Sequence, residues 1–232
     1  MNNKIVIIDF GMGNLFSIKL ACESAGLKCL ITDQKKDILE AGGVILPGVG
    51  AFGDAMAYLK KFDLIGPLKD FIDSGRPFLG ICLGMQLLMS ESEEFGRHKG
   101  LNIIQGSVVR FPLQSSQGEK IKVPQVGWNQ IFPRDKTQEN FSQTSPLKGS
   151  KKGEYMYFVH SFYVKPAEEN LIVSLTDYEG TLYCSSLQKG NIFAAQFHPE
   201  RSAKQGVQIY KNWALQVSSL KSIGPEKKYA VS

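Results

Sequence analysis

Short apolar runs alternate with amphipathic stretches in the first part of the chain. Each apolar run ends in a turn signal, as buried strands do, and each amphipathic stretch has the spacing of a helix. The pattern predicts strands at residues 4–9, 28–32, 43–46 and 77–81, and helices at residues 15–25, 51–61 and 64–74. Because nearly continuous apolar strands alternate with helices, we expect an α/β fold with a mostly parallel central sheet flanked by helices.

The second part of the chain has a different pattern, in which short strands follow one another with turns between them. The expected strands are residues 108–111, 121–124, 129–132, 155–160, 171–176, 182–187 and 192–196, before a closing helix at 203–220. These strands predict a mixed or antiparallel extension of the sheet. The polar residues 133–153 are expected to form a surface excursion. We therefore expect one domain over residues 1–217 and a frayed polar tail over residues 218–232.

One short motif lies at a predicted strand-to-helix junction, Gly80-Ile-Cys82-Leu-Gly84. A nucleophile on such a tight turn needs small residues two places on either side, since a side chain there would collide with the neighbouring backbone. The N-terminus of the following helix favours the reactive thiolate. Cys82 is therefore the candidate nucleophile. The other cysteines are expected to be ordinary core residues, namely Cys22, Cys29 and Cys184.

A base and an acid for this nucleophile are found near the far end of the chain, at His198-Pro199-Glu200. Pro199 favours an extended backbone at His198, and residues two apart in an extended segment project to the same side. Glu200 is thus expected to hold one imidazole nitrogen while the other faces Cys82, as in a catalytic triad. Two alternatives stay open: His160 is the base, or Cys82, His160, His198 and Glu200 bind zinc. Only His198 and Glu200 have ligand spacing, so no metal is expected.

Two glycine-containing segments follow predicted strands. Pro47-Gly48-Val49-Gly50 exposes bare backbone, and its N–H groups together with that of Leu83 are expected to form an oxyanion hole. The alternative is a plain turn between a strand and a helix. Gly11-Met-Gly13-Asn14 lacks the third glycine of a dinucleotide-binding loop, since Phe16 occupies that position. We expect a tight turn there, with Asn14 capping the next helix.

Composition narrows the class of protein further. The formal net charge of +5 is modest, and the lysines are spread along the chain without an accompanying cluster of arginine and aromatic residues, so no nucleic-acid partner is expected. The four cysteines lack paired spacing, which disfavours a disulfide framework. Neither a signal peptide nor a membrane-spanning segment is recognisable. A cytoplasmic protein is the natural expectation.

These motifs resemble the triad-type (class I) glutamine amidotransferases. The Cys82 elbow and His198-Pro-Glu200 are typical of the whole superfamily. Within it, the chain is most similar to the glutaminase subunits of imidazole glycerol phosphate synthase, over residues 4–215. The motifs that narrow the resemblance are Gly11-Met-Gly-Asn14, Gly127-Trp-Asn129 and Phe158-Val-His-Ser161.

The resemblance implies hydrolysis of glutamine to glutamate and ammonia without a cofactor, within a glutamine amidotransferase type-1 domain. Gly50 and Gln86 would hold the glutamine, and the backbone around Ser161 and Phe162 would bind its amino and carboxylate groups. The ammonia would pass to a (β/α)8-barrel cyclase subunit, in a heterodimer that makes imidazole glycerol phosphate and aminoimidazole carboxamide ribotide during histidine biosynthesis. The implied interface and ammonia-gate residues are Asn14, Trp128, Tyr157 and Arg201.

Two residues depart from the family pattern. Gln125 replaces a common histidine and Arg201 replaces the more usual lysine, and both are expected to touch the partner face more than the chemistry. They leave open which synthase is the partner. The alternatives are a paralogous glutaminase that supplies a sugar amidotransferase of surface-polysaccharide assembly, a γ-glutamyl peptidase that acts alone, and a catalytically silent regulatory module.

Overall fold

Parallel strands form the centre of the fold. The computed structural model describes residues 4–11, 13–115, 118–135 and 137–219, so Met12 and most of the expected tail, residues 220–232, lie outside the described residues. The parallel strands are, in sheet order, β2 (Lys28–Thr32), β1 (Lys4–Ile8), β3 (Gly43–Leu46), β4 (Phe78–Ile81) and β13 (Ile192–Ala195). The predicted α/β class with a mostly parallel sheet is confirmed.

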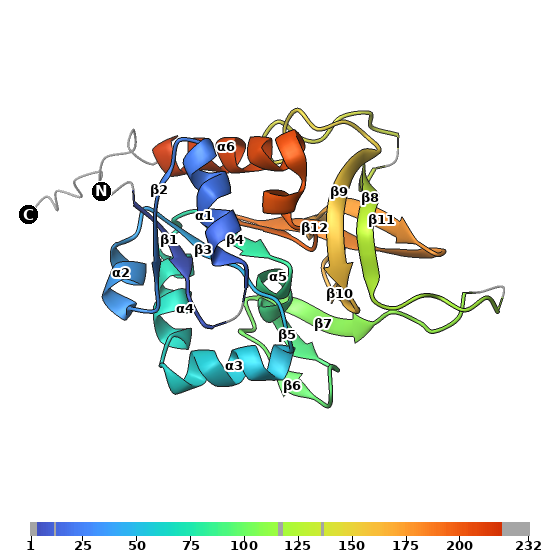
Figure 1. Ribbon diagram of the computed structural model, residues 1–232, viewed down its shortest axis with the longest axis horizontal. Helices are drawn as coiled ribbons and strands as arrows, with labels where there is room; N and C mark the ends of the chain where they lie inside the picture. Colours follow the sequence, from blue (N-terminus) through green and yellow to red (C-terminus); the bar gives the residue numbers. More distant parts are fainter. Residues whose placement is uncertain (1–3, 12, 116–117, 136, 220–232) are drawn as a thin grey trace, which may run out of the picture.

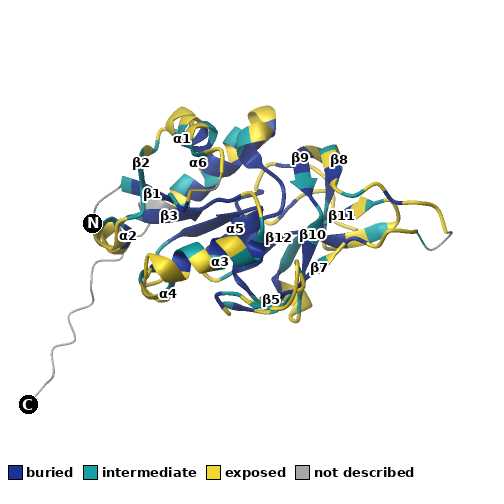
Figure 2. Cartoon of the chain, turned by 60° about the horizontal axis from the view of Figure 1, so that its bottom comes forward, coloured by how far each residue is buried: buried dark blue, intermediate teal, exposed yellow. Residues whose placement is uncertain are grey.

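Helices cover both faces of these strands (Figure 1). Because alternate residues of a strand point to opposite faces, β1 divides its side chains between two apolar cores. Ile5 and Ile7 belong to the core under two helices, α1 (Leu15–Ser24) and α6 (Ala203–Ser219). Val6 and Ile8 belong to the opposite core, under α2 (Lys35–Glu40), α3 (Phe52–Lys61) and α4 (Ile65–Asp73). Figure 2 shows the burial of the central strands between these layers.

A mostly antiparallel extension continues the sheet beyond β13. The sheet order there is β12 (Thr181–Lys189), β10 (Phe162–Pro166), β7 (Ile104–Arg110), β5 (Met89–Ser92) and β6 (His98–Lys99). Of these named pairs, only β5 and β7 run parallel to each other. A branch leaves β12 through β11 (Ile172–Tyr178), β8 (Gln125–Pro133) and β9 (Glu154–His160). The predicted mixed extension is confirmed, and it brings the end of β9 beside the parallel strands.

Several predicted elements differ in the structure. The expected strand 121–124 is not formed, and β8 begins only at Gln125. The helix after Cys82, α5 (Leu83–Leu87), has five residues because the chain turns at once into β5, whose Met89 pairs with Ile104 of β7. Short strands of this kind depend on distant partners, so local periodicity does not indicate them. The elements that were not predicted are α2, β5, β6 and β10.

Residues 134–153 connect β8 to β9, and those of them that the structure describes form no helix or named strand. The predicted excursion is only partly at the surface, because Phe141 and Leu147 are buried. The side chain of Asn212 in α6 donates to the carbonyl oxygens of Pro146 and Lys148 at 2.9 and 2.7 Å. The connection therefore packs against α6.

Candidate active site

Cys82 lies on the turn between β4 and α5. Its backbone has φ 53° and ψ −107°, a conformation that residues with a side chain rarely adopt. A Cβ atom added at Gly84 would lie 1.8 Å from the carbonyl oxygen of Leu46, and one at Gly80 would lie 3.1 Å from the Cβ of Ala194. The predicted need for small residues on both sides of Cys82 is thereby confirmed.

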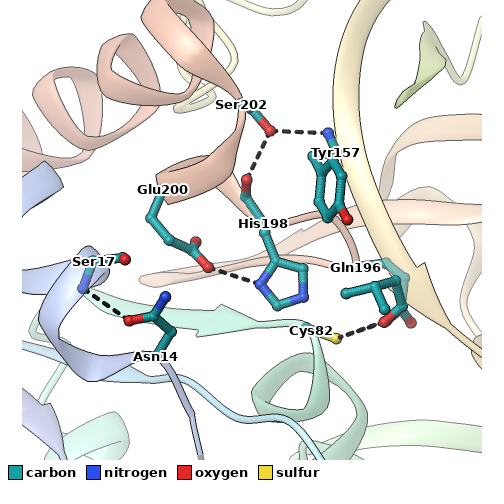
Figure 3. A network of polar contacts seen from close by, with 9 residues as sticks. Asn14, Ser17, Cys82, Tyr157, Gln196, His198, Glu200 and Ser202 are labelled. Atoms are coloured by element: carbon teal, nitrogen blue, oxygen red, sulfur yellow. Dashed lines mark hydrogen bonds and ion pairs between the residues drawn. The ribbon is translucent and has the colours of Figure 1, made fainter. Parts of the chain in front are cut away.

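His198 and Glu200 follow β13, the strand that pairs with β4. The backbone of His198 is extended, as Pro199 predicts, but residues Pro199–Arg201 then form a single turn of 3₁₀ helix. This turn, rather than a continued strand, places Glu200 Oε1 2.8 Å from His198 Nδ1 (Figure 3). Ser202 supports the turn, since its hydroxyl donates to the carbonyl oxygen of His198 at 2.7 Å and accepts the N–H of Tyr157 at 3.0 Å.

The electrostatic surroundings of His198 favour its charged form. Burial by itself lowers the pKa of His198, but the negative charge of a Cys82 thiolate and the carboxylate of Glu200 outweigh it and raise the pKa to about 10. Within the described part of the chain, His198 Nε2 has no hydrogen-bond partner. The thiol of Cys82 instead points to the carbonyl oxygen of Val159 at 3.9 Å, and its sulfur accepts from Gln196 Nε2 at 3.6 Å. Cys82 nevertheless lies close enough to His198 to raise the pKa of its imidazole.

The backbone beside Cys82 contains the residues expected to form an oxyanion hole. The N–H of Leu83 donates to the carbonyl oxygen of Gly48 at 3.3 Å, so the protein's own backbone occupies this donor. Gly48 is tightly enclosed, since a Cβ there would lie 2.8 Å from the ring of Phe10. Val49 is largely exposed and Gly50 has φ 103°, which a residue with a side chain rarely adopts. Through this hydrogen bond the segment lies directly against the turn that carries Cys82.

A separate hollow lies next to α5. Its volume is about 420 Å³, and its lining residues are Glu93, Glu94, Phe95, Gly96, Arg110, Ser161 and Phe162. Ser161 and Phe162 were predicted from the resemblance. Glu94 and Arg110 were not, because neither belongs to a recognisable motif. Together they give the hollow both charges that a zwitterionic amino acid needs.

Gln86 joins this hollow to the nucleophile. Its side chain is buried, and its Nε2 donates to the carbonyl oxygen of Phe162 at 2.9 Å and to Gln196 Oε1 at 3.1 Å. Both amide hydrogens are therefore used, so Gln86 would meet a ligand with its Oε1. Gln196 is a third residue that sequence reasoning missed, since only the fold shows its contact with Cys82.

The four predicted interface residues lie around the mouth of the triad. Asn14 and Arg201 line a small hollow of about 50 Å³ that also contacts His198 and Glu200. The guanidinium of Arg201 lies 4.0 Å from the ring centre of Tyr157, and Trp128 meets Tyr157 edge-on at 6.1 Å. Asn14 also caps α1 as predicted, because its Oδ1 accepts the N–H of Ser17 at 3.2 Å. Asn14, Trp128 and Arg201 are exposed, and Tyr157 is half-buried between Trp128 and Arg201.

Gln125 does not lie on that surface, contrary to expectation. It is buried, and its Oε1 accepts the hydroxyl of Tyr183 at 2.9 Å. His160 is buried beside it, with Nδ1 2.8 Å from the carbonyl oxygen of Phe162 and Nε2 3.3 Å from the Tyr183 hydroxyl. Burial lowers the pKa of His160 to about 3, against the raising effect of its contact with Phe162. His160 is therefore a neutral core residue, which disfavours it as the base.

Among the described residues, no group of three or more His, Cys, Asp or Glu side chains is placed to hold a metal ion. No helix in the described ranges is long and apolar enough to cross a membrane.

Comparison with known proteins agrees with this geometry. The family model "Glutamine amidotransferase class-I" matches residues 6–217, and the chain belongs to this family. Its relatives include proteins named "Imidazole glycerol phosphate synthase subunit HisH". The one from Syntrophotalea carbinolica is 46% identical over 90% of this chain and 98% of its own length. The one from Aquifex aeolicus is 40% identical over 94% of this chain and 99% of its own length.

Among solved structures, PurLQS from Thermotoga maritima matches with a TM-score of 0.67 and 18% identity, over 95% of this chain and all of the matched chain. This similarity supports the fold.

Proposed function

We propose that this chain is the glutaminase subunit of imidazole glycerol phosphate synthase, which hydrolyses glutamine and supplies ammonia for histidine biosynthesis. The observation that best supports glutamine hydrolysis is the strained turn that places Cys82 beside the paired His198 and Glu200. The assignment to this synthase rests on the common name of relatives that match 90% and 94% of the chain.

The first half of the proposed reaction forms a thioester. The thiolate of Cys82 attacks the side-chain amide carbon of glutamine, and the carbonyl oxygen becomes an oxyanion. The imidazolium of His198 then protonates the amide nitrogen as the carbon–nitrogen bond breaks, and ammonia leaves. Glu200 holds the imidazole in the orientation for this transfer and stabilises its positive charge.

The second half releases glutamate. His198, now neutral, accepts a proton from a water molecule that attacks the thioester carbonyl. The tetrahedral intermediate collapses, the carbon–sulfur bond breaks, and the Cys82 thiolate and imidazolium are restored. The hollow lined by Glu94, Arg110 and the backbone of Ser161 and Phe162 would bind the amino and carboxylate groups of the substrate.

Ammonia is useful only if it reaches an acceptor before it escapes into water. The exposed surface formed by Asn14, Trp128, Tyr157 and Arg201 would therefore dock a (β/α)8-barrel cyclase subunit in a heterodimer, with the small hollow at Asn14 and Arg201 as the exit. The free thiol on which the chemistry depends fits a reducing cytoplasm.

The nucleophile is tested by comparing the two nitrogen sources. In the complex with the cyclase, Cys82→Ala and Cys82→Ser should each reduce glutamine-dependent synthesis by about a thousandfold or more. Synthesis from added ammonium salt should stay within about twofold of wild type, because the cyclase site is unchanged. Equal loss with both nitrogen sources would refute the role of Cys82.

A further inference from the structure

The amide of Gln196 lies against the sulfur of Cys82. Gln196 directly follows β13 and is fully buried, and its backbone N–H donates to the carbonyl oxygen of Ser185 at 2.9 Å. Its side-chain Nε2 lies 3.6 Å from Cys82 Sγ. The mechanism above makes no use of this group.

Neighbouring residues decide which end of the Gln196 amide meets the sulfur. The carbonyl oxygen of Phe162 is only an acceptor, so the atom of Gln86 that faces it must be the nitrogen. The same nitrogen faces Gln196, which must therefore present its oxygen there. The remaining end of Gln196 is its NH₂ group, and this end is directed at Cys82. Because each donor along this series of hydrogen bonds faces an acceptor, the orientation of both side-chain amides is fixed.

An N–H donor distinguishes between the two states of a sulfur atom. A neutral thiol is a weak acceptor, whereas a thiolate is charged and accepts strongly. In a buried site the difference is larger than in water, because no solvent competes for the charge. A donor fixed against Cys82 before the reaction therefore stabilises the reactive state without reorganisation.

We propose that Gln196 is a further catalytic residue, which donates an amide N–H to the sulfur of Cys82 and stabilises its thiolate, with Gln86 as the residue that positions it. The inference rests on the proposed role of Cys82 as nucleophile. The same hydrogen bonds link the hollow beside α5 to Cys82, through Phe162, Gln86 and Gln196 in turn.

The test measures how fast iodoacetamide alkylates Cys82 in the full chain as a function of pH, with the adduct quantified at that residue by peptide mass spectrometry. In Gln196→Met, alkylation at neutral pH should fall about tenfold, because one hydrogen bond to a charged group is lost. The rise of the rate with pH should also move to higher pH, and the rates of variant and wild type should converge in strongly alkaline solution. An unshifted pH profile would overturn the proposal.

Two further variants separate this role from a structural one. Gln196→Glu keeps the shape and the acceptor for Gln86 but presents an oxygen to the sulfur, so it should also slow alkylation at neutral pH even if Gln196→Met does not fold. Wild-type reactivity in Gln196→Glu would contradict the proposal. Gln125→Met is the matched control, since Gln125 is equally buried but bonds to Tyr183, and its profile should match wild type.

A parallel labelling of wild type with a diazoketone analogue of glutamine distinguishes failure of this inference from failure of the proposed function. Labelling at Cys82 would uphold the glutaminase assignment whatever the Gln196 variants do. Absence of labelling, in the complex as well as in the isolated chain, would refute that assignment and the inference with it.

Discussion

Two histidines near the site are held in opposite charge states by their surroundings. Cys82 and the carboxylate of Glu200 outweigh burial and raise the pKa of His198, whereas His160 is buried against a carbonyl oxygen and a tyrosine hydroxyl and its pKa is lowered. The residue chosen as base from the sequence, His198, has its acid two positions away, and this spacing is visible without a structure. The contact of Gln196 with Cys82 and that of Glu94 with Phe52 are not visible in the sequence, because each joins segments that are distant along the chain.

The state of His160 leads to a measurable pH dependence of stability. Its pKa is about 3 in the folded protein, whereas the ordinary value is 6.5. Protonation of His160 therefore favours the unfolded chain. The stability that comes from keeping this histidine neutral is complete above pH 6.5 and is lost as the pH falls towards 3. Between pH 7 and pH 4 this group alone should lower the free energy of unfolding by roughly 3 kcal/mol.

Urea denaturation of wild type and His160→Gln at both pH values checks this expectation. The variant lacks the titrating group, so its free energy of unfolding should fall less between pH 7 and pH 4, although it starts lower because packing is lost. Carboxylates elsewhere contribute equally to both proteins and cancel in the comparison. An equal decrease in both would show that His160 does not control the acid response.

At the scale of elements, the turn from β4 into α5 depends on the neighbouring strand β3. Gly84, in the first turn of α5, lies directly against the carbonyl oxygen of Leu46, and a backbone atom in the centre of a sheet cannot move aside. Gly84→Ala should therefore lower the free energy of unfolding by about 3 kcal/mol and displace Cys82.

A helical glycine with open space around it provides the comparison. Gly66 in α4 has no atom within 4 Å of an added Cβ, apart from its own neighbours in the chain. Gly66→Ala should stay within about 1 kcal/mol of wild type. Similar losses in the two variants, measured by urea denaturation, would contradict a specific clash at the elbow.

The elements that the sequence predicted well are those with a strong local pattern. Strands β1 to β4 are continuous apolar runs bounded by turn residues, and their predicted ranges agree with the structure to within one residue. Strand β10 has no such pattern, because its pairing with the distant β7 defines it. Strands β5 and β6 are too short to show a pattern, and their pairing with each other and with β7 defines them. Residues 121–124 show the reverse case, an apolar pattern without a strand partner.

At the scale of the whole molecule, the site lies where the parallel strands β3, β4 and β13 end and the extension begins. The carboxyl ends of parallel strands are the usual place for a binding site in an α/β fold. This position was predictable from the motifs, since the glycine segment, the elbow and the triad histidine each follow a predicted strand. The engagement of the Leu83 N–H by Gly48 was not predictable, because it depends on the rotation of single peptide groups.

The hydrogen bond from the Leu83 N–H to the carbonyl oxygen of Gly48 has a consequence for the isolated chain. Since loss of one oxyanion donor costs about a hundredfold to a thousandfold in rate, the chain alone should hydrolyse glutamine slowly. A (β/α)8-barrel cyclase with its nucleotide ligand, docked on the surface around Trp128 and Arg201, should stimulate the reaction roughly a hundredfold or more. Glutamate release by the purified chain, alone and with the cyclase, is the measurement. Full activity without a partner would contradict the coupling.

The order of strands in the sheet also determines when the site can form during synthesis on the ribosome. The strand next to the nucleophile, β13, is the last one in the sequence, and Gln196 stands 114 residues after Cys82. At a synthesis rate of about 5 to 20 residues per second, several seconds pass between the two. A nascent or truncated chain thus carries the thiol without its base, its acid or its buried amide, so only a finished protein can begin to consume glutamine.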